Sequence, residues 1–302
     1  MKLFIKANEG DITNMIITAI ALDMDGTLLD SKNQIQENTI EILSELRKKG
    51  IKIFLVTGRT RKEIEDIIPN DFPYDGAVTS NGMGCYTREK EVMQYHLDDR
   101  LVKHVIALAQ KYKVYYEVHS QQCGRHALEK DRKMMETEIE QSVPDTLKEN
   151  EYFSRQKAIE SGISWVDQLD YKNVVKIYFF SMYLEKIEKW KEMLDNMKQI
   201  KLFSTSSSTL HNVEMMRENV SKATGLNMLL RQFNLSATEV MAIGDGENDL
   251  TMFELCSISI AMKNAPDIVK EKAHFVTKET HDNHGLYLFL KGWKEKGYFS
   301  GY

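Results

Sequence analysis

The sequence predicts an α/β protein built on a doubly wound, mostly parallel sheet. Three observations support this fold class. Short runs such as residues 16–22 and 51–56 are almost entirely apolar, as expected for strands that are buried on both faces. Segments with helical spacing of apolar residues lie between such runs. A polar loop follows each run, where open α/β sheets bind their ligands.

The N-terminal part of the pattern alternates strands with helices. We expect strands over residues 16–22 and 51–56, with a helix over residues 37–49 between them. Thr60 and Glu63 have the spacing of a capping box, which predicts that another helix begins there.

A third short strand is expected over residues 77–79. After a long interval the same pattern resumes, with two more strands expected over residues 240–243 and 257–260. Asn264 and Pro266 then suit the start of a helix. Together these segments predict one parallel sheet covered by helices on both faces.

The composition changes in the middle of the chain, where Lys, Glu and Tyr become more frequent. We therefore predict that residues 84–215 form a separate α+β domain inserted into a first domain. Residues 1–83 and 216–302 make up that first domain, and residues 1–14 are expected to be a loose tail.

Several strands are expected in the inserted domain. Residues 114–118 and 174–180 have strand-like composition. Residues 201–203 and 210–215 could pair as a hairpin around a turn at residues 204–208. The aromatic group Tyr112, Tyr115 and Tyr116 is expected to pack in the core of this domain.

The bulk properties exclude several classes of protein. The 302 residues are 42% hydrophobic and 28% charged, which is typical of a soluble globular protein. The net charge is −5 and no basic stripe is present, so nucleic acid is not an expected partner. No apolar stretch approaches the ~20 residues that span a bilayer, so a membrane is not expected either. Three widely spaced cysteines predict a reducing, cytoplasmic location.

The clearest chemical signal is Asp23-Met24-Asp25-Gly26-Thr27, directly after the first expected strand. Two carboxylates two positions apart can take different roles, Asp23 as a nucleophile and Asp25 as a general acid and base. An Asx turn would explain the pattern without catalysis. Half of a calcium loop is another explanation, but no Glu with the required spacing follows.

With this motif, the sequence resembles the haloacid dehalogenase-like hydrolases, and among them the Cof-type phosphatases with a large type IIB cap after the third core strand. The resemblance extends from about Ile16 to Leu290. It implies that Asp23 attacks phosphorus and forms an aspartyl-phosphate intermediate. It also implies that Asp25 is the acid and base.

The resemblance assigns roles in phosphate binding to further residues. Thr57-Gly58-Arg59 matches the second motif, in which the hydroxyl and backbone N–H groups bind a phosphate oxygen. Lys222 matches the third motif and would offset phosphoryl charge. Residues 216–219 stand where the family usually has Pro and Gly. Asn81 matches a residue at the cap junction that can touch phosphate, with a plain turn as the alternative.

Gly244-Asp245-Gly246-Glu247-Asn248-Asp249 matches the fourth motif. Acidic side chains at the end of a parallel strand can complete an oxygen site for Mg²⁺. By resemblance Asp245 is a direct ligand, together with Asp23 and the backbone carbonyl of Asp25, whereas Asn248 and Asp249 support them. A Gly-rich turn that caps the next helix is the structural alternative, and one residue can do both.

These residues predict a magnesium-dependent phosphatase that acts on a small phosphorylated metabolite, such as a sugar phosphate. A phosphomutase and a non-catalytic phosphate-sensing module are the alternatives, and the second would lack a catalytic group. His119, Arg125 and Ser206 of the inserted domain are candidates for substrate contact. Residues 281–285 contain two histidines, but we expect a solvated loop there and not a metal site.

Overall fold

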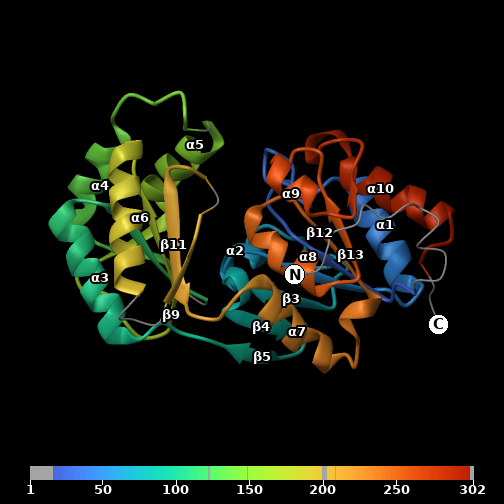
Figure 1. Ribbon diagram of the computed structural model, residues 1–302. Coiled ribbons are helices and arrows are strands. Elements are labelled where there is room, and N and C mark those ends of the chain that lie inside the picture. Colours follow the sequence, from blue (N-terminus) through green and yellow to red (C-terminus); the bar gives the residue numbers. More distant parts are fainter. Residues whose placement is uncertain (1–15, 122, 148, 199–202, 208, 300–302) are drawn as a thin grey trace. The chain divides into compact units, whose positions relative to one another are not determined.

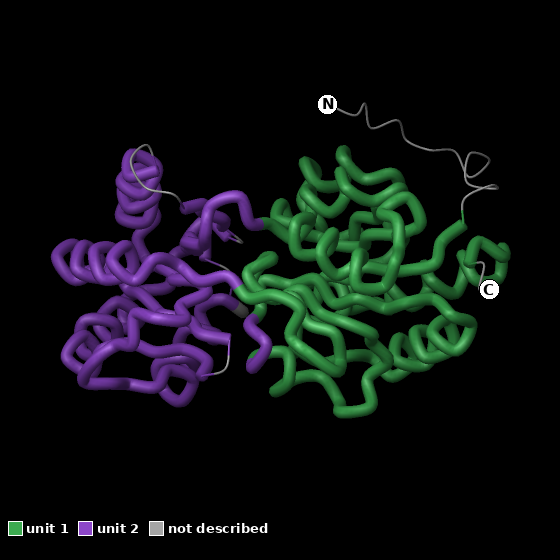
Figure 2. The backbone as a smooth tube through the Cα atoms, turned by 90° about the horizontal axis from the view of Figure 1, so that it is seen from below, with its two compact units in different colours: residues 1–59, 63–94, 221–302 green, residues 60–62, 95–220 purple. Residues whose placement is uncertain are grey.

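The computed structural model describes residues 16–299 except for residues 122, 148, 199–202 and 208. The expected tail, residues 1–14, lies outside this range. The chain divides into two compact units (Figure 2). Unit 1 contains residues 1–59, 63–94 and 221–302, and unit 2 contains residues 60–62 and 95–220.

Unit 1 is built around an eight-stranded sheet (Figure 1). Its strands are, from one edge to the other, β14 (Phe275–Val276), β13 (Ile258–Ala261), β12 (Val240–Gly244), β1 (Ala19–Leu22), β2 (Lys52–Val56), β3 (Gly76–Thr79), β4 (Gly84–Thr87) and β5 (Glu91–Gln94). The six strands from β14 to β3 are parallel, and β4 and β5 continue the sheet in antiparallel pairing. The predicted α/β fold class is confirmed.

Helices bury both faces of this sheet. They are α1 (Glu37–Lys48), α7 (Lys222–Gln232), α8 (Leu250–Leu255), α9 (Asp267–Glu271) and α10 (Gly285–Glu295). Successive side chains of a strand point to opposite faces, so Ile20 and Leu22 pack in the core with α1 and α10. Ala19 and Ala21 pack in the other core with α7 and α8. Burial on both faces explains the apolar runs in the sequence.

The strand order reverses at β1. The chain proceeds from β1 to β2 and β3 on one side, and later from β12 to β13 and β14 on the other. Ligands of doubly wound proteins bind at such a switch point, outside the carboxyl ends of the strands. Asp23, Thr57 and Asp245 are the first residues after β1, β2 and β12, respectively.

Unit 2 has a six-stranded sheet with the strand order β10-β11-β9-β6-β7-β8. The strands are β6 (Tyr115–Ser120), β7 (Gly124–Leu128), β8 (Ile163–Val166), β9 (Val174–Phe180), β10 (Phe203–Ser206) and β11 (Asn212–Arg217). The helices are α3 (Asp99–Tyr112), α4 (Arg132–Ile139), α5 (Glu149–Lys157) and α6 (Leu184–Lys198). Antiparallel pairing of β10 with β11 confirms that this part of the chain forms a hairpin, but the expected turn was placed too early, because Ser204, Thr205 and Ser206 are paired strand residues. Residues 201, 202 and 208 lie outside the described range.

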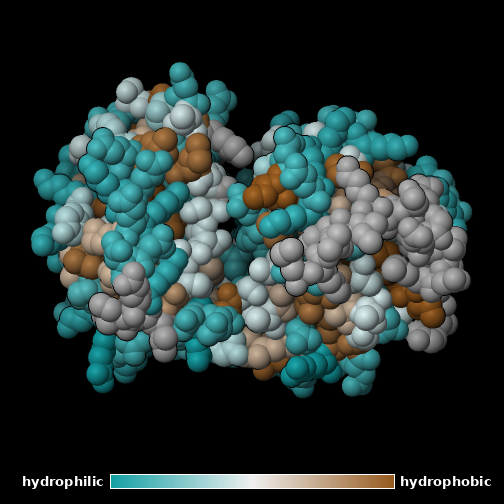
Figure 3. All heavy atoms as spheres, viewed as in Figure 1, coloured by the Kyte–Doolittle hydropathy of each residue, from teal (hydrophilic) through white to brown (hydrophobic). Residues whose placement is uncertain are grey.

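The aromatic group of unit 2 is mostly internal. Tyr115 and Tyr116 are fully buried, which confirms that they pack in the core. Tyr112 is 48% exposed, so the expectation was wrong for this residue. Its position at the end of α3 leaves it outside the helix face that packs on the sheet. Hydrophilic residues cover most of the face of each unit drawn in Figure 3, and hydrophobic residues form small separate groups there.

The boundaries of the units differ from the expected ones. Residues 84–94 belong to unit 1, because β4 pairs with β3 and β5 with β4. Residues 216–220 belong to unit 2, since β11 extends to Arg217. The hairpin of β4 and β5 was not predicted, because β5 is a polar edge strand without the apolar run of the buried strands.

Residues 60–62, at the start of helix α2 (Arg61–Glu65), also belong to unit 2. The backbone N–H of Arg61 donates to Gln121 Oε1 at 2.8 Å. The backbone N–H of Lys62 donates to the Gln121 carbonyl at 3.2 Å. These two bonds tie residues 60–62 to the turn after β6.

Candidate active site

The turn after β1 is tight and depends on a glycine. The backbone N–H groups of Leu28 and Leu29 donate to the Met24 carbonyl at 3.0 and 2.8 Å. Gly26 has a φ of +76°, a left-handed conformation that side chains other than glycine rarely adopt. A Cβ at this position would also clash with the carboxylate of Asp245. The glycine therefore allows the turns after β1 and β12 to approach each other.

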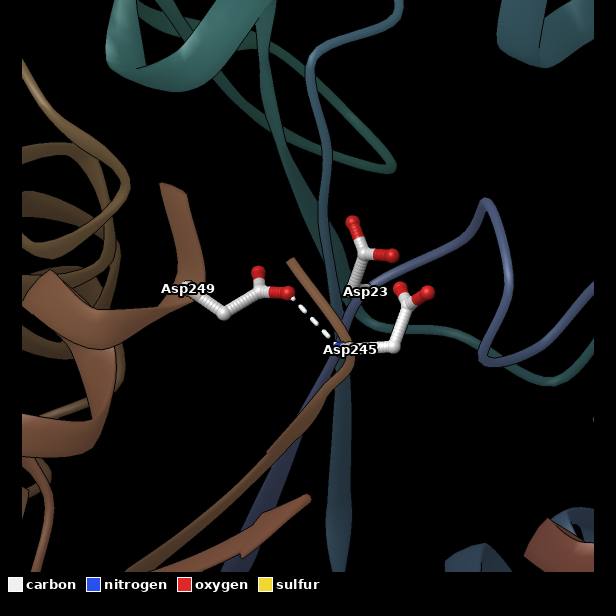
Figure 4. A group of neighbouring side chains, drawn as sticks. All are labelled: Asp23, Asp245 and Asp249. Carbon is white, nitrogen blue, oxygen red and sulfur yellow. Dashed lines mark hydrogen bonds between the residues drawn. The ribbon is translucent and has the colours of Figure 1, made fainter. Parts of the chain in front are cut away.

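Three carboxylates meet at this edge of the sheet. One oxygen from each of Asp23, Asp245 and Asp249 lies within 4.8 Å of the others. Figure 4 shows the carboxylates of Asp23 and Asp245 close together, with Asp249 approaching from the other side. Asp23 is 5% exposed and Asp249 is fully buried. Among the acidic, His and Cys side chains of the described residues, these three form a group that is compact enough to hold a metal ion.

Lys222 joins this cluster from a position 199 residues after Asp23. Its Nζ donates to Asp23 Oδ1 and Asp249 Oδ1, both at 2.5 Å, and the side chain is fully buried. Ser221 caps helix α7 with a capping box and so fixes Lys222 in the first turn. Asn219, three residues before Lys222, has a φ of +60°, a left-handed conformation. With Met216-Arg217-Glu218-Asn219 before it, Lys222 still reaches Asp23.

The charges of this cluster are unbalanced. Burial raises the pKa of Asp23 well above its ordinary range, Lys222 lowers it only in part, and Asp249 and Asp245 raise it further. Burial acts to lower the pKa of Lys222, but Asp23 and Asp249 more than offset this and hold it above its ordinary value. One ammonium group does not compensate the surrounding carboxylates, so the cluster would be stabilised by an additional cation.

Asp249 is engaged by its own turn. Its Oδ2 accepts from the backbone N–H groups of Asp245 at 2.9 Å and Gly246 at 2.8 Å, while Oδ1 accepts from Lys222. Gly244 makes room for this carboxylate, since a Cβ there would clash with it. Asp249 therefore orients Lys222 and the turn. Asp23 and Asp245 offer the carboxylate oxygens that suit a hard cation such as Mg²⁺.

The second expected motif lies next to Asn81. Thr57 is fully buried, and its Oγ1 accepts from the backbone N–H of Arg59 at 3.1 Å. The backbone N–H of Asn81 donates to the Thr57 carbonyl at 2.9 Å. A Cβ on Gly58 would lie 3.3 Å from both amide atoms of the Asn81 side chain, so a glycine allows this approach. Asn248 Nδ2 donates to Asn81 Oδ1 at 3.1 Å.

Arg59 has a contact that the sequence analysis did not anticipate. Its Nε donates to Asp25 Oδ2 at 2.9 Å and its Nη2 to Asp25 Oδ1 at 2.5 Å. The same Nη2 donates to Asn33 Oδ1 at 2.8 Å. The Asp25 side chain is 55% exposed, so this pair lies at the open side of the site. The only signal in the sequence was the position of Arg59 three residues after a strand end.

Asn264 was also missed, because only its suitability for a helix start was considered. Its Nδ2 donates to the Gly26 carbonyl at 2.8 Å and to Asp245 Oδ2 at 3.1 Å. In the loop at residues 281–285, Asp282, Asn283 and His284 are exposed, which confirms the expectation of a solvated loop. The histidines of this loop are not part of the metal-compatible group found among the described residues.

The candidates for substrate contact share one face of the sheet of unit 2. His119 is paired with Arg125 on one side and with Lys176 on the other. Ser206 is paired with Glu214, Glu214 with Tyr178 of β9, and Tyr178 with Glu117 of β6. Glu117 is two residues before His119, so its side chain points to the same face of the sheet. Their contact with a substrate stays a prediction.

Comparison with known proteins identifies a family. A sequence model of the haloacid dehalogenase-like hydrolases matches residues 20–290. The chain is 28% identical over 284 residues to a putative phosphatase of Mycoplasma genitalium, covering 92% of this chain and 98% of the relative. It is 27% identical over 281 residues to a Bacillus subtilis protein named 5-amino-6-(5-phospho-D-ribitylamino)uracil phosphatase, covering 90% and 96%.

Solved structures share the fold. A phosphatase of the haloalkanoate enzyme superfamily from Bacteroides thetaiotaomicron superposes with a TM-score of 0.70 at 26% identity, covering 97% of this chain and 98% of that one. A haloacid dehalogenase-like hydrolase from B. subtilis has a TM-score of 0.74 at 24% identity, covering 91% and 99%. Among the described helices, none is both long and apolar enough to cross a membrane.

Proposed function

Because this chain belongs to the haloacid dehalogenase-like hydrolase family, we propose that it is a magnesium-dependent phosphatase of a small phosphorylated metabolite. Its class, a phosphoric monoester hydrolase, is confirmed by the family and by relatives named phosphatases. One observation carries the finer proposal: Lys222, Asp23 and Asp249, from three distant parts of the chain, form one buried hydrogen-bonded group.

Asp23 is the proposed nucleophile. Its carboxylate oxygen attacks phosphorus, the bond from phosphorus to the leaving oxygen breaks, and an aspartyl phosphate forms. Lys222 holds Asp23 Oδ1 at 2.5 Å and offsets charge on the phosphoryl group. A bound Mg²⁺, held by Asp23, Asp245 and the backbone carbonyl of Asp25, would offset the repulsion between the anionic nucleophile and the anionic substrate.

Asp25 is the proposed general acid and base. It donates a proton to the leaving oxygen and later accepts one from the water that hydrolyses the aspartyl phosphate. Hydrogen bonds from Arg59 hold both carboxylate oxygens of Asp25 and so restrict its rotation. The contact fixes where the carboxylate lies, and one oxygen has to turn away from Arg59 before it can carry the proton.

Phosphate binding is proposed for the turn after β2 and its neighbour. The hydroxyl of Thr57 and the backbone N–H groups around Gly58 can donate to phosphoryl oxygens. Asn81 lies against Gly58 and is held by Asn248. We assign Asn248 and Asp249 supporting roles, in positioning Asn81 and Lys222, respectively.

We further propose that unit 2, residues 95–220, is the cap that selects the substrate. A sugar phosphate or similar monoester is the proposed substrate class. The name of the B. subtilis relative supports it, because that protein's substrate carries a phosphorylated ribityl group. The cytoplasmic location inferred from the cysteines also stays a prediction.

The proposal is tested by measuring free phosphate released from a panel of phosphorylated metabolites, with Mg²⁺ and with EDTA. We expect turnover that requires Mg²⁺ and that Asp23→Asn abolishes. Asp71→Asn, which alters an exposed aspartate of the same unit, serves as the control and should leave activity unchanged. Activity that persists in EDTA or in Asp23→Asn would contradict the proposal. An isomerised sugar phosphate without free phosphate would favour a phosphomutase.

A further inference from the structure

The side-chain amide of Asn264 connects two turns of the candidate site. Asn264 follows β13, outside the four motifs that define the site. One nitrogen, Nδ2, donates both to the Gly26 carbonyl in the turn after β1 and to Asp245 Oδ2 in the turn after β12. A single donor group thus fixes the distance between the backbone of one turn and the carboxylate of the other.

The orientation of this amide is determined by its other end. The backbone N–H of His281 donates to Asn264 Oδ1 at 3.1 Å. An N–H group can only donate, so the amide oxygen must face His281 and the NH₂ group must face Gly26 and Asp245. Both of those partners are acceptors, and the arrangement is satisfied in one orientation only.

The loop behind Asn264 is anchored as well. Gln36 Nε2 donates to the carbonyls of His281 at 3.2 Å and Asp282 at 3.1 Å. The backbone N–H of Ser31 donates to Asp282 Oδ1 at 2.8 Å, and this bond holds the pKa of Asp282 below its ordinary value. Asn264 therefore rests on a support that is itself bonded to the segment after the β1 turn.

We propose that Asn264 is a positioning residue that sets the divalent-cation affinity of the site through its hydrogen bond to Asp245. This inference rests on the proposed function. Ligand carboxylates are commonly oriented by outer hydrogen bonds, and losing one typically costs about 10–100-fold in metal affinity or activity. Thr27 Oγ1 donates to Asp245 Oδ1 at 3.4 Å, and Asn264 holds the other oxygen, Oδ2, at 3.1 Å. The like charges of Asp23, Asp245 and Asp249 repel one another, so loss of the shorter of these two bonds should loosen the Asp245 carboxylate.

The test is calorimetric titration of Mg²⁺ into metal-free protein without substrate. In Asn264→Ala and the similarly sized Asn264→Leu we expect the Mg²⁺ dissociation constant to rise about 10–100-fold. The kcat at saturating Mg²⁺ should stay within a few-fold of wild type, because Asn264 does not touch the reacting groups. The control is Asn283→Ala, an exposed asparagine whose Nδ2 donates to Thr280, and it should bind Mg²⁺ normally.

The possible outcomes are distinct. An unchanged dissociation constant in folded Asn264→Leu overturns the inference and leaves the proposed function intact. No Mg²⁺ binding by the wild-type protein contradicts the proposed function and with it the inference. If circular dichroism shows that neither Asn264 variant is folded, Gln36→Ala is tested instead. It removes the hydrogen bonds to the carbonyls of His281 and Asp282 and changes no residue of the site. Weaker Mg²⁺ binding there supports the inference, and unchanged binding overturns it.

Discussion

Each unit buries a carboxylate against a cationic side chain, yet the pKa values of the two carboxylates are shifted in opposite directions. In unit 1, Asp23 pairs with Lys222 and its pKa is raised by burial and by neighbouring carboxylates. In unit 2, Glu117 pairs with Arg155 from α5. Burial acts to raise the pKa of Glu117, but Arg155 and Arg125 hold it well below its ordinary range.

The neighbours explain this difference. Glu117 is fully buried, and Tyr115 Oη donates to it at 2.5 Å while His119 Nε2 lies at 3.1 Å. Arg125 Nη1 is 3.6 Å away, so cationic groups outnumber the carboxylate. In unit 1 the carboxylates of Asp23, Asp245 and Asp249 each have an oxygen within 4.8 Å of the others, and a single ammonium, that of Lys222, pairs with Asp23 and Asp249.

The comparison separates a structural charge cluster from a reactive one. The cluster around Glu117 already contains the charges that it needs, so its contribution should be to the stability of unit 2. The cluster around Asp23 lacks positive charge, so it should be completed by a cation and an incoming phosphoryl group.

The largest effect is expected when the cation of the reactive cluster is removed. Lys222→Met should lower kcat by roughly 10²–10³-fold, because a buried donor to the phosphoryl group is lost. Its Mg²⁺ affinity should not fall, since the carboxylates have lost a competing cation. Steady-state kinetics and calorimetry measure both quantities. Lys48→Met, at an exposed position of α1, is the control, and an unchanged kcat in Lys222→Met would remove the basis for calling this cluster reactive.

A substitution in the cluster around Glu117 should lower the stability of the protein and leave kcat unchanged. Glu117→Gln leaves Arg155 buried without its counter-ion, and breaking a buried pair in this way costs about 3–5 kcal/mol. Urea denaturation should show this loss, and Mg²⁺ should not reverse it. Glu185→Gln, at an exposed i,i+4 pair with Lys189, should leave the midpoint unchanged. A Glu117→Gln protein of wild-type stability would show that the two clusters do not differ as argued.

The sequence predicted the reactive cluster better than the structural one, for a physical reason. Asp23, Thr57 and Asp245 each follow a strand that is buried on both faces, and such strands are visible as apolar runs. Parallel pairing then places their carboxyl ends at one edge of the sheet. These positions agree with the family resemblance, which supplied the roles of Thr57, Asp245 and Lys222.

The partners of these residues could not be predicted in the same way. Arg59 and Asn264 lie in loops, and their contacts depend on turn geometry that leaves no periodic pattern. The cluster around Glu117 alternates with core residues along β6, so in sequence its members look like the polar side of an ordinary strand. Burial of that side by α5 is a tertiary contact that composition does not encode.

A smaller effect is expected at the open side of the reactive cluster. Arg59→Ala releases Asp25, so protonation of the leaving oxygen should suffer most for substrates that need it. For an alkyl phosphate we expect kcat/KM to fall about 10²-fold, the lower range for general acid catalysis. For p-nitrophenyl phosphate, whose leaving group departs without a proton, the fall should be much smaller.

The ratio of the two kcat/KM values distinguishes positioning of Asp25 from general damage to the site. Arg59→Lys keeps the charge but cannot hold both oxygens of Asp25, so it should show an intermediate ratio. An equal fall for both substrates would mean that Arg59 acts on the site as a whole. In that case Arg59 would be part of the reactive cluster itself and not only a residue that positions Asp25.

The smallest effect concerns the pH dependence of the structural cluster. The pKa of Glu117 in the folded protein is below its ordinary value of 4.5, so below that pH the unfolded chain binds the proton more readily than the folded one. The stability contributed by Glu117 is therefore present above about pH 4.5 and is lost as the pH falls toward the folded pKa, at about 1.4 kcal/mol per pH unit. The difference in urea stability between wild type and Glu117→Gln should narrow over this range. A difference that is independent of pH would show that Glu117 is not held ionised by its arginines, and the contrast with Asp23 would then have another origin.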